Sequence, residues 1–541
     1  MLLAAAAGVA AAGVAAADAA ASVAGAADES SSPGSNPCTD SPGPVALGSA
    51  QWNGWGRSVD NTRYQPEPAI RATDVEKLTL KWAFGYPGAV ASAQPTIVDG
   101  RVFAASATGR VYSLDAKTGC TYWSYEAQAG VRTAISIAEL APARLPKRPA
   151  RSKRSRHRLT NAHLEVQKPP SAAFFGDEKG TVYALDAENG TLLWKTPIDP
   201  HPTARIEGSP TLYQDRLYVA VGSSEESLAA DPTYACCTFR GSVAALDIAT
   251  GRVLWKTYTV SEEPRPDGKS ASGAQEFAPA GVPISAAPTI DASRGVLYVA
   301  TGRSYTANEQ PLADAVMALD LVDGKVRWAK QLSAEGAAEL GSSPILRSLA
   351  SGKQVLLIGQ RSGVVSSLDP DRAGEILWET KAGENKADGG VDQGAAADHR
   401  SVYVALGGLA ADPANQSGSL TALDIRTGAK RWRTDAPTPS CSWGGDEPCG
   451  HGEAQAVTVI PGVAFSGSED GHLRAYSTID GKILWDYDTA RDFVTVNRVK
   501  ASGGSLHQGG PTIVNGVLYV NSGSGSGRPG NVLLAFSVDG K

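Results

Sequence analysis

The chain has 541 residues and a formal net charge of −6, with 59 glycines, 33 prolines and only 2 methionines. That glycine and proline content disfavours a helical protein, and 42% hydrophobic beside 20% charged residues excludes global disorder. The acidic balance argues against a nucleic-acid-binding surface over most of the chain, and the lack of an apolar run of about 20 bulky residues after the N-terminus excludes a multi-span membrane protein.

The start of the chain has the composition of a targeting segment. Residues 1–27 are almost entirely Ala, Gly and Val, which is typical of the apolar part and small-residue cleavage site of a secretory signal. No Lys or Arg precedes Arg57, so the basic start of such a signal is missing, and a low-complexity alanine tract is the alternative. Residues 28–51 are predicted to be a linker, and residues 52–541 the folded domain.

The strongest signal is a repeated unit of the form apolar-Leu-Asp-x-x-x-Gly-x-x-x-Trp. Each copy predicts a strand, a tight turn and a second strand ending on Trp, because Asp, Asn and Gly suit hairpin turns. Repeats of roughly 40–70 residues with several strands predict propeller blades. The recurring Trp is interpreted as a core ring between blades, with its N–H available to a backbone partner. Seven copies end at Trp123, Trp194, Trp255, Trp328, Trp378, Trp432 and Trp485.

The two ends of the chain predict the number of blades. The last unit, residues 533–541, stops short of its Trp strand, whereas residues 75–84 offer a Trp strand (Trp82) with no preceding Asp unit. Joining them closes the ring and removes free sheet edges. The predicted fold is therefore all-β: an eight-bladed β-propeller closed by N- and C-terminal strands.

Residues 141–170 interrupt this pattern with nine Lys or Arg residues against one acid, Glu165. The segment contains several prolines and no apolar periodicity, so it is interpreted as a solvated, disordered insertion between two strands. The alternative is an anion-binding or nucleic-acid-binding patch.

Six cysteines bear on the compartment. An even number with one close pair predicts three disulfides in an oxidising compartment, and six reduced thiols in a cytosolic protein are the alternative. No Cys-x-x-Cys or Cys-x-x-Cys-His occurs, so attached c-type haem and the common zinc spacings are absent. The cysteines are Cys38, Cys120, Cys236, Cys237, Cys441 and Cys449.

Several strings resemble one known family. The opening QWNGWGRSVDNTRYQP followed by VEKLTLKW resembles quinoprotein alcohol dehydrogenases, which use pyrroloquinoline quinone (PQQ). The strings GVRTAISI, GSSEES, ACCTFRGSVAALD and PGNVLLAFSVDGK are similar to the polyvinyl-alcohol dehydrogenases of that family. The resemblance covers nearly everything from Trp52 to Lys541 except the basic insertion.

The resemblance implies PQQ at the propeller axis beside Ca²⁺. A tricarboxylate cofactor needs cationic and hydroxyl partners, and Ca²⁺ needs oxygen ligands and polarises a quinone carbonyl. A carboxylate base removes the alcohol proton as hydride leaves carbon. The resemblance implies Glu226 as a metal ligand, with Glu225 the alternative, and cofactor contacts from Arg132, Ser223, Cys236, Cys237, Phe277 and Arg361. The two cysteines would form a vicinal disulfide over the quinone, and Phe277 would replace a floor tryptophan.

Three positions depart from the family pattern. Arg303 stands where the family has an Asp or Asn metal ligand, and its charge would repel Ca²⁺. The segment between Gln331 and Gly341 is shorter than the family segment that carries the aspartate base, so Glu335 or Glu339 is the substitute. Residues 285–288, Ser-Ala-Ala-Pro, replace the family's Trp-Ser-Ser-Pro.

The resemblance implies a secreted or periplasmic PQQ-dependent enzyme that oxidises secondary hydroxyls to ketones. Its partners would be an alcohol substrate and a separate, cytochrome c-like electron acceptor. The alternative is a propeller that has lost its metal and base and serves as a binding scaffold. Arg303 and the shortened segment favour the scaffold, whereas Glu226, the Cys236–Cys237 pair and Arg361 favour the enzyme.

Overall fold

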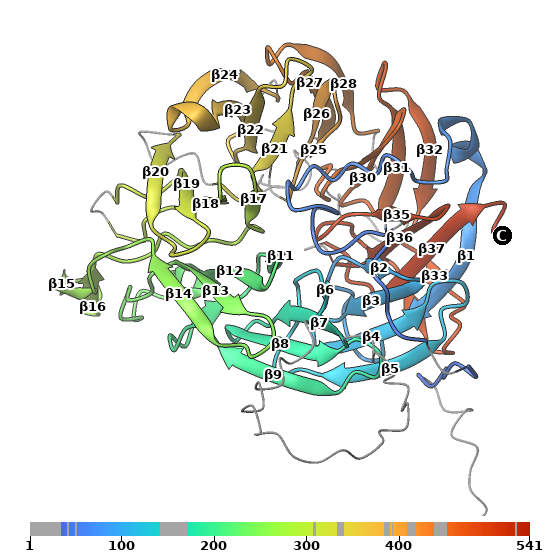
Figure 1. Cartoon of the computed structure of the whole chain (residues 1–541), viewed down its shortest axis with the longest axis horizontal. Coiled ribbons are helices and arrows are strands. Elements are labelled where there is room, and N and C mark those ends of the chain that lie inside the picture. The colour runs from blue at the N-terminus through green and yellow to red at the C-terminus, as the bar shows by residue number, and fades with distance from the viewer. Residues whose placement is uncertain are drawn as a thin grey trace, which may run out of the picture.

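Eight β-sheets stand like blades around a central axis in the computed structural model of this chain (Figure 1). The predicted all-β, eight-bladed propeller is thereby confirmed. The structure describes residues 34–40, 43–48, 51–140, 170–306, 310–332, 340–383, 390–391, 393–407, 418–437, 452–524 and 527–541.

Seven blades are antiparallel meanders formed in chain order, one for each complete sequence repeat. The first strand of each blade contacts the first strands of neighbouring blades, which makes it the innermost. The first three of these blades are β2 (Thr96–Val98), β3 (Arg101–Ala105), β4 (Arg110–Asp115) and β5 (Thr121–Glu126); β6 (Ser136–Glu139), β7 (Ser171–Gly176), β8 (Thr181–Asp186) and β9 (Leu192–Pro197); and β11 (Thr211–Tyr213), β12 (Arg216–Ser223), β13 (Ser242–Asp247) and β14 (Val253–Tyr258), with β10 (Ala204–Arg205) pairing the end of β12.

The next four blades repeat the same order. They are β17 (Thr289–Asp291), β18 (Val296–Ala300), β19 (Ala315–Asp320) and β20 (Val326–Gln331); β21 (Ile345–Ser348), β22 (Gln354–Gly359), β23 (Val364–Asp369) and β24 (Glu375–Lys381); β25 (Ala396–Ala397), β26 (Ser401–Leu406), β27 (Ser419–Asp424) and β28 (Lys430–Asp435); and β29 (Thr458–Ile460), β30 (Val463–Gly467), β31 (His472–Ser477) and β32 (Ile483–Asp488).

The eighth blade joins the two ends of the chain. Its inner strands are β35 (Thr512–Val514), β36 (Val517–Ser522) and β37 (Val532–Val538), and its outer strand is β1 (Leu78–Gly85). β1 and β37 pair antiparallel from Leu78 opposite Val538 to Gly85 opposite Val532. The closure predicted from the incomplete last unit is confirmed.

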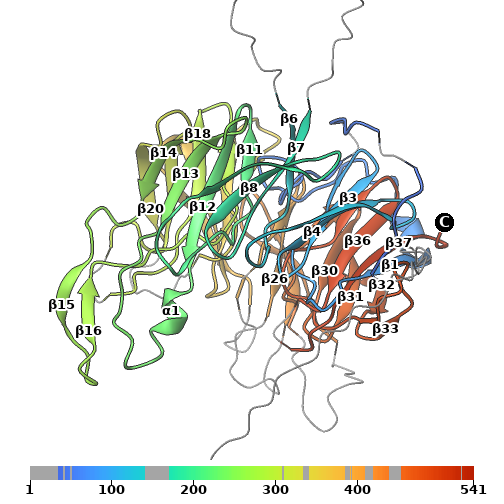
Figure 2. The same ribbon diagram turned by 90° about the horizontal axis from the view of Figure 1, so that it is seen from below.

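Few elements lie outside the blades. They are the hairpins β15 (Arg265–Lys269)–β16 (Gln275–Ala278) and β33 (Asp492–Phe493)–β34 (Ala501–Ser502), the helix α1 (Glu225–Leu228) and two 3₁₀ turns, η2 (Ala72–Lys77) and η3 (Pro370–Arg372). From the side, α1 and the β15–β16 hairpin extend from the same side of the propeller (Figure 2). In the part of the chain that the structure describes, no helix is long and apolar enough to cross a membrane.

The repeated tryptophans link neighbouring blades. The indole N–H of Trp194 donates to the carbonyl of Ile248 in the next blade at 2.9 Å, and the ring lies against Gly251 in the turn of that blade. Trp123, Trp255, Trp378 and Trp432 donate to the next blade in the same way. Trp485 and Trp82 carry the linkage across the closing blade. The interpretation of these rings as core residues between blades is confirmed.

Residues 52–65, the hub segment, run around the inner ends of the blades. Trp52 pairs with Ile97 of β2 through two backbone hydrogen bonds. Further along, the carbonyls of the hub segment accept amide hydrogen bonds from the innermost strands β17, β21, β25 and β29. In Figure 1 this segment crosses the centre of the ring as a blue trace. The tryptophan-rich opening motif therefore has a structural role at the hub.

Two disulfides occur among the described residues. Cys38 of the predicted linker is bonded to Cys120 in the β4–β5 turn, and Cys236 is bonded to Cys237. Cys441 and Cys449, which would form the predicted third, lie outside the described residues, as do residues 1–33 and 141–169.

Candidate active site at the propeller hub

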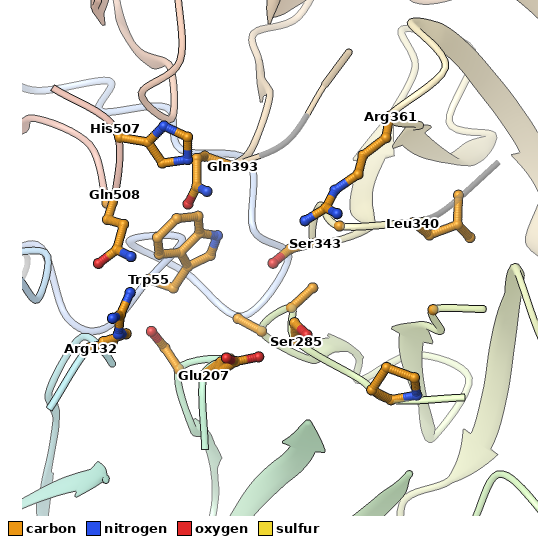
Figure 3. A pocket seen from close by; sticks show the side chains of 18 residues that line it. Trp55, Arg132, Glu207, Ser285, Leu340, Ser343, Arg361, Gln393, His507 and Gln508 are labelled. Carbon is orange, nitrogen blue, oxygen red and sulfur yellow. The ribbon is translucent and has the colours of Figure 1, made fainter. Parts of the chain in front are cut away.

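A cavity of 320 Å³ lies at the hub, and most of its lining residues come just before the innermost strands of the blades. Because each blade starts from an equivalent position on the ring, side chains far apart in sequence converge there. Figure 3 shows them around the axial cavity, with Trp55 of the hub segment among them. The polar and charged members are Arg132, Glu207, Ser209, Ser285, Ser343, Arg361, Gln393, His507 and Gln508.

The two arginines predicted to face a cofactor both line the axial cavity, and they enter it from opposite sides (Figure 3). Arg132 forms an ion pair with Glu178, while Glu207 lies near it on the cavity wall. Arg361, from the β22–β23 turn, also lines a second cavity. Guanidinium groups on two sides suit a ligand with more than one carboxylate, because each can form charge-assisted hydrogen bonds.

A third guanidinium lies beneath the indole of Trp55. Arg63 is fully buried, and its guanidinium carbon lies 4.7 Å from the centre of the Trp55 ring. Its hydrogen-bond partners are the carbonyls of Trp55 and Val457 and the side chains of Gln94 and Thr458. Burial lowers the pKa of Arg63 to about 9. A bound anion would stabilise this charge, so the hub is electrostatically suited to one.

The second cavity is larger, at 690 Å³, and is lined by Glu226, Cys237, Arg303 and Arg361 among others. Glu226 and Arg303 form an ion pair, with 35% and 49% of their side chains exposed. This open cavity shares Arg361 with the axial cavity. The structure therefore places Glu226, Cys237 and Arg361 around one cavity that adjoins the axial cavity at Arg361.

Glu225 and Ser223, by contrast, line neither cavity. The buried carboxylate of Glu225 accepts hydrogen bonds from the amides of Thr238 and Phe239, both at 2.8 Å. The Ser223 hydroxyl accepts the amide hydrogen of Glu225 at 2.9 Å. These contacts tie α1 to the chain just after the disulfide and so position Glu226 and Cys237.

Phe277 is also placed away from both cavities. It lies on β16, where its amide donates to the carbonyl of Cys236 at 2.8 Å. This hydrogen bond places the backbone of the β15–β16 hairpin next to the disulfide. The aromatic ring on the axial cavity is Trp55 instead. Glu335 and Glu339, the predicted bases, lie outside the described residues.

His507 is a cavity residue that the sequence analysis did not identify. Its Nδ1 lies 2.5 Å from a carboxylate oxygen of Glu469, whose side chain is 7% exposed. A histidine oriented by a buried carboxylate has the geometry of a general acid or base. Its position in the repeat could have identified it. His507 comes just before the innermost strand β35, and Gln393, which also lines the cavity, comes just before β25.

The donor set does not fit a calcium ion at Glu226. Within the described residues, no group of three or more His, Cys, Asp or Glu side chains could hold a metal, whereas Ca²⁺ needs about six to eight oxygen ligands. The Glu226 carboxylate already pairs with Arg303. A divalent ion about 4 Å from that guanidinium would be opposed by about 2 kcal/mol even at the dielectric constant of water.

Two family profiles match most of the chain. The profile described as "Glucose/ethanol/alcohol dehydrogenase, beta-propeller domain" matches residues 52–354, and that of "Outer membrane protein assembly factor BamB" matches residues 361–541. A polyvinylalcohol dehydrogenase of Pseudomonas sp is 42% identical over 520 residues, covering 91% of this chain and 77% of that protein. A second, from Sphingopyxis sp. strain 113P3, is 40% identical over 544 residues, covering 93% and 79%.

Solved structures share the fold at lower identity. The quinohemoprotein alcohol dehydrogenase ADHIIG of Pseudomonas putida HK5 matches with a TM-score of 0.67 and 17% identity, over 93% of this chain and 83% of that one. A europium-containing methanol dehydrogenase matches with a TM-score of 0.65 and 18% identity, over 91% and 98%.

Proposed function

This chain belongs to the family of PQQ-dependent quinoprotein alcohol dehydrogenases, and we propose that it oxidises secondary hydroxyls of polyvinyl-alcohol-like substrates to ketones. The observation that carries the proposal is the convergence of Arg132 and Arg361 on one hub cavity, from opposite sides. The names of the two 40–42% identical relatives support the substrate class.

The described residues fit the cofactor. Arg132 and Arg361 would each hold a carboxylate of PQQ, and the Trp55 ring, supported by Arg63, would offer it a flat apolar face. The Cys236–Cys237 disulfide borders the open cavity beside Arg361 through Cys237. PQQ supplies a quinone that accepts two electrons from the alcohol carbon.

The substrate would enter through the open cavity, whose charged side chains are partly exposed to solvent. Glu335 or Glu339 is proposed to remove the hydroxyl proton, on the sequence argument. His507, held by Glu469 on the axial cavity wall, is a described group with the same chemical capacity. The variants Glu339→Gln, Glu335→Gln and His507→Asn identify the base. The variant that loses turnover but still binds PQQ is the one that lacks it.

We further propose a secreted or periplasmic location and an external, cytochrome c-like acceptor. The Cys38–Cys120 bond, which ties the N-terminal linker to the propeller, supports an oxidising compartment. The external acceptor follows from the resemblance to quinoprotein alcohol dehydrogenases.

Reconstitution tests the proposed function. Purified protein is mixed with PQQ, with and without Ca²⁺, and assayed for bound quinone absorbance and for dye reduction with polyvinyl alcohol and small alcohols.

Arg361→Gln should lower PQQ affinity about 10- to 100-fold, the effect of losing one charge-assisted hydrogen bond. Arg110→Gln is the matched control, because Arg110 pairs with Glu126 at 2.8 Å on a blade strand away from the cavity. If the wild type binds no quinone and reduces no dye, only the scaffold alternative is left.

A further inference from the structure

The Glu226–Arg303 ion pair is built into the wall of the open cavity. Glu226 lies on α1, which follows β12, and Arg303 follows β18, so two neighbouring blades supply the partners. The backbone fixes Arg303, because its carbonyl accepts the amide hydrogen of Val282 at 2.9 Å, and Gly302 donates to Pro283 at 2.8 Å. The fold therefore fixes the backbone from which Arg303 reaches Glu226, and the ion pair places its guanidinium beside the carboxylate.

The open cavity is already net positive without a metal ion. Its charged lining residues among the described part of the chain are Glu226, Arg303 and Arg361, which leave one net positive charge. A divalent cation bound to Glu226 beside both arginines would raise that net charge to three. Arg303 therefore takes the place of a metal ion as the positive partner of Glu226.

A guanidinium can do part of the chemical work of a metal ion. It carries five N–H donors in a rigid plane, stays charged, and is more weakly hydrated than an ammonium group. Donors fixed before the reaction, and aimed at an oxygen that gains negative charge, stabilise that charge as a Lewis acid does. About half of the Arg303 side chain is exposed beside Glu226, so the group is accessible to a ligand in the open cavity.

We propose that Arg303 replaces the divalent cation of this site. Its guanidinium neutralises Glu226 and donates a hydrogen bond to a carbonyl oxygen of the cofactor, whose ring extends from the axial cavity past the shared residue Arg361 into the open cavity, so cofactor binding needs no metal ion. The identity of that carbonyl rests on the proposed function, because it belongs to the quinone.

Calcium titration of the protein without PQQ tests the metal half of this inference independently of any activity. Calorimetry of the wild type with Ca²⁺, and separately with La³⁺, should show no stoichiometric binding. Elemental analysis of the dialysed protein should show no retained divalent metal. One equivalent of Ca²⁺ or La³⁺ bound by the wild type would overturn the proposal, whatever PQQ does.

Cofactor titration tests the arginine half. In excess EGTA the wild type should bind PQQ as tightly as in Ca²⁺, as measured by fluorescence quenching. Arg303→Gln should weaken binding in EGTA about 10- to 100-fold, Arg303→Lys should restore part of it, and Arg110→Gln should match the wild type. Equal affinity in Arg303→Gln and the wild type, or loss of wild-type binding in EGTA, would contradict the role of Arg303.

Failure of the proposed function would be recognised separately. A wild type that binds no PQQ in either Ca²⁺ or EGTA would refute both the quinone function and the cofactor contact of Arg303. The calorimetric result would still decide whether Arg303 excludes a metal from Glu226.

Discussion

A buried cluster of charges in β31 shows how single residues support the hub. Arg474 is 1% exposed and lies 2.8 Å from Asp470 and 3.3 Å from Glu453. Asp470 lies in the turn between β30 and β31, directly after Glu469, the carboxylate that holds His507 on the cavity wall. Removing one member of a buried ion pair costs about 3–5 kcal/mol, so the turn that positions His507 is strongly fixed.

His472, in the same cluster, makes part of this stability depend on pH. Its Nδ1 lies 2.6 Å from Asp486, and that hydrogen bond raises the pKa of His472 above 6.5. A folded-state pKa above the unfolded one stabilises the protein fully below about 6.5, and the stabilisation is lost as pH rises through the raised value.

His472→Asn keeps a neutral hydrogen-bond donor but removes the titrating charge. The thermal midpoint of the wild type should therefore exceed that of the variant most at about pH 6, and the difference should shrink as the pH is raised through the titration of His472. A difference that is constant between acidic and alkaline pH would show that the charge of His472 contributes nothing to stability.

Some of the site residues could be predicted from the short sequence strings in which they stand, and others could not. Arg132, Arg361 and Glu226 stand in strings that resemble the family, and all three line the hub cavities. Trp55 and His507 lie in the axial cavity only because the hub segment and the start of the closing blade meet there, which no local pattern reveals.

At the scale of elements, the contact between a Trp and the turn glycine of the next blade recurs around the ring. A Cβ added at Gly251 would come within 2.5 Å of the Trp194 ring, and at Gly324 within 2.4 Å of the Trp255 ring. These glycines also have positive φ values of 70° and 71°. The repeat thus requires glycine for two separate reasons, backbone conformation and the close approach of the neighbouring indole.

Gly251→Ala and Gly100→Ala separate these two reasons. Both glycines have φ near 70°, but a Cβ at Gly100 would meet no atom within 4 Å. Gly100→Ala should cost about 1–2 kcal/mol from the left-handed backbone alone, and Gly251→Ala about 1–3 kcal/mol more from overpacking. Urea denaturation of the two variants measures the difference, and equal losses would refute the packing role of the indole.

The strands could be predicted from the sequence because each repeat carries its own turn and its own alternating strands. The Cys38–Cys120 bond could not, since its partners are 82 residues apart and six cysteines allow many pairings. The path of the hub segment likewise depends on contacts with strands up to hundreds of residues away.

At the scale of the whole molecule, closure of the ring creates the site. The pairing of β1 with β37 brings the loop before β35, with His507 and Gln508, next to Arg132 and across the axial cavity from Arg361 (Figure 3). The hub segment then supports Trp55 from below through Arg63. The axial cavity, where cofactor binding is proposed, therefore depends on the closed eight-bladed ring.

A crystal structure of the protein grown with PQQ, in EGTA, would show where the cofactor binds. We expect quinone density in the axial cavity, with carboxylates on Arg132 and Arg361, the ring against Trp55, and Arg303 still paired with Glu226. Quinone density elsewhere on the protein, or a hub cavity filled only by water at saturating PQQ, would contradict this expectation.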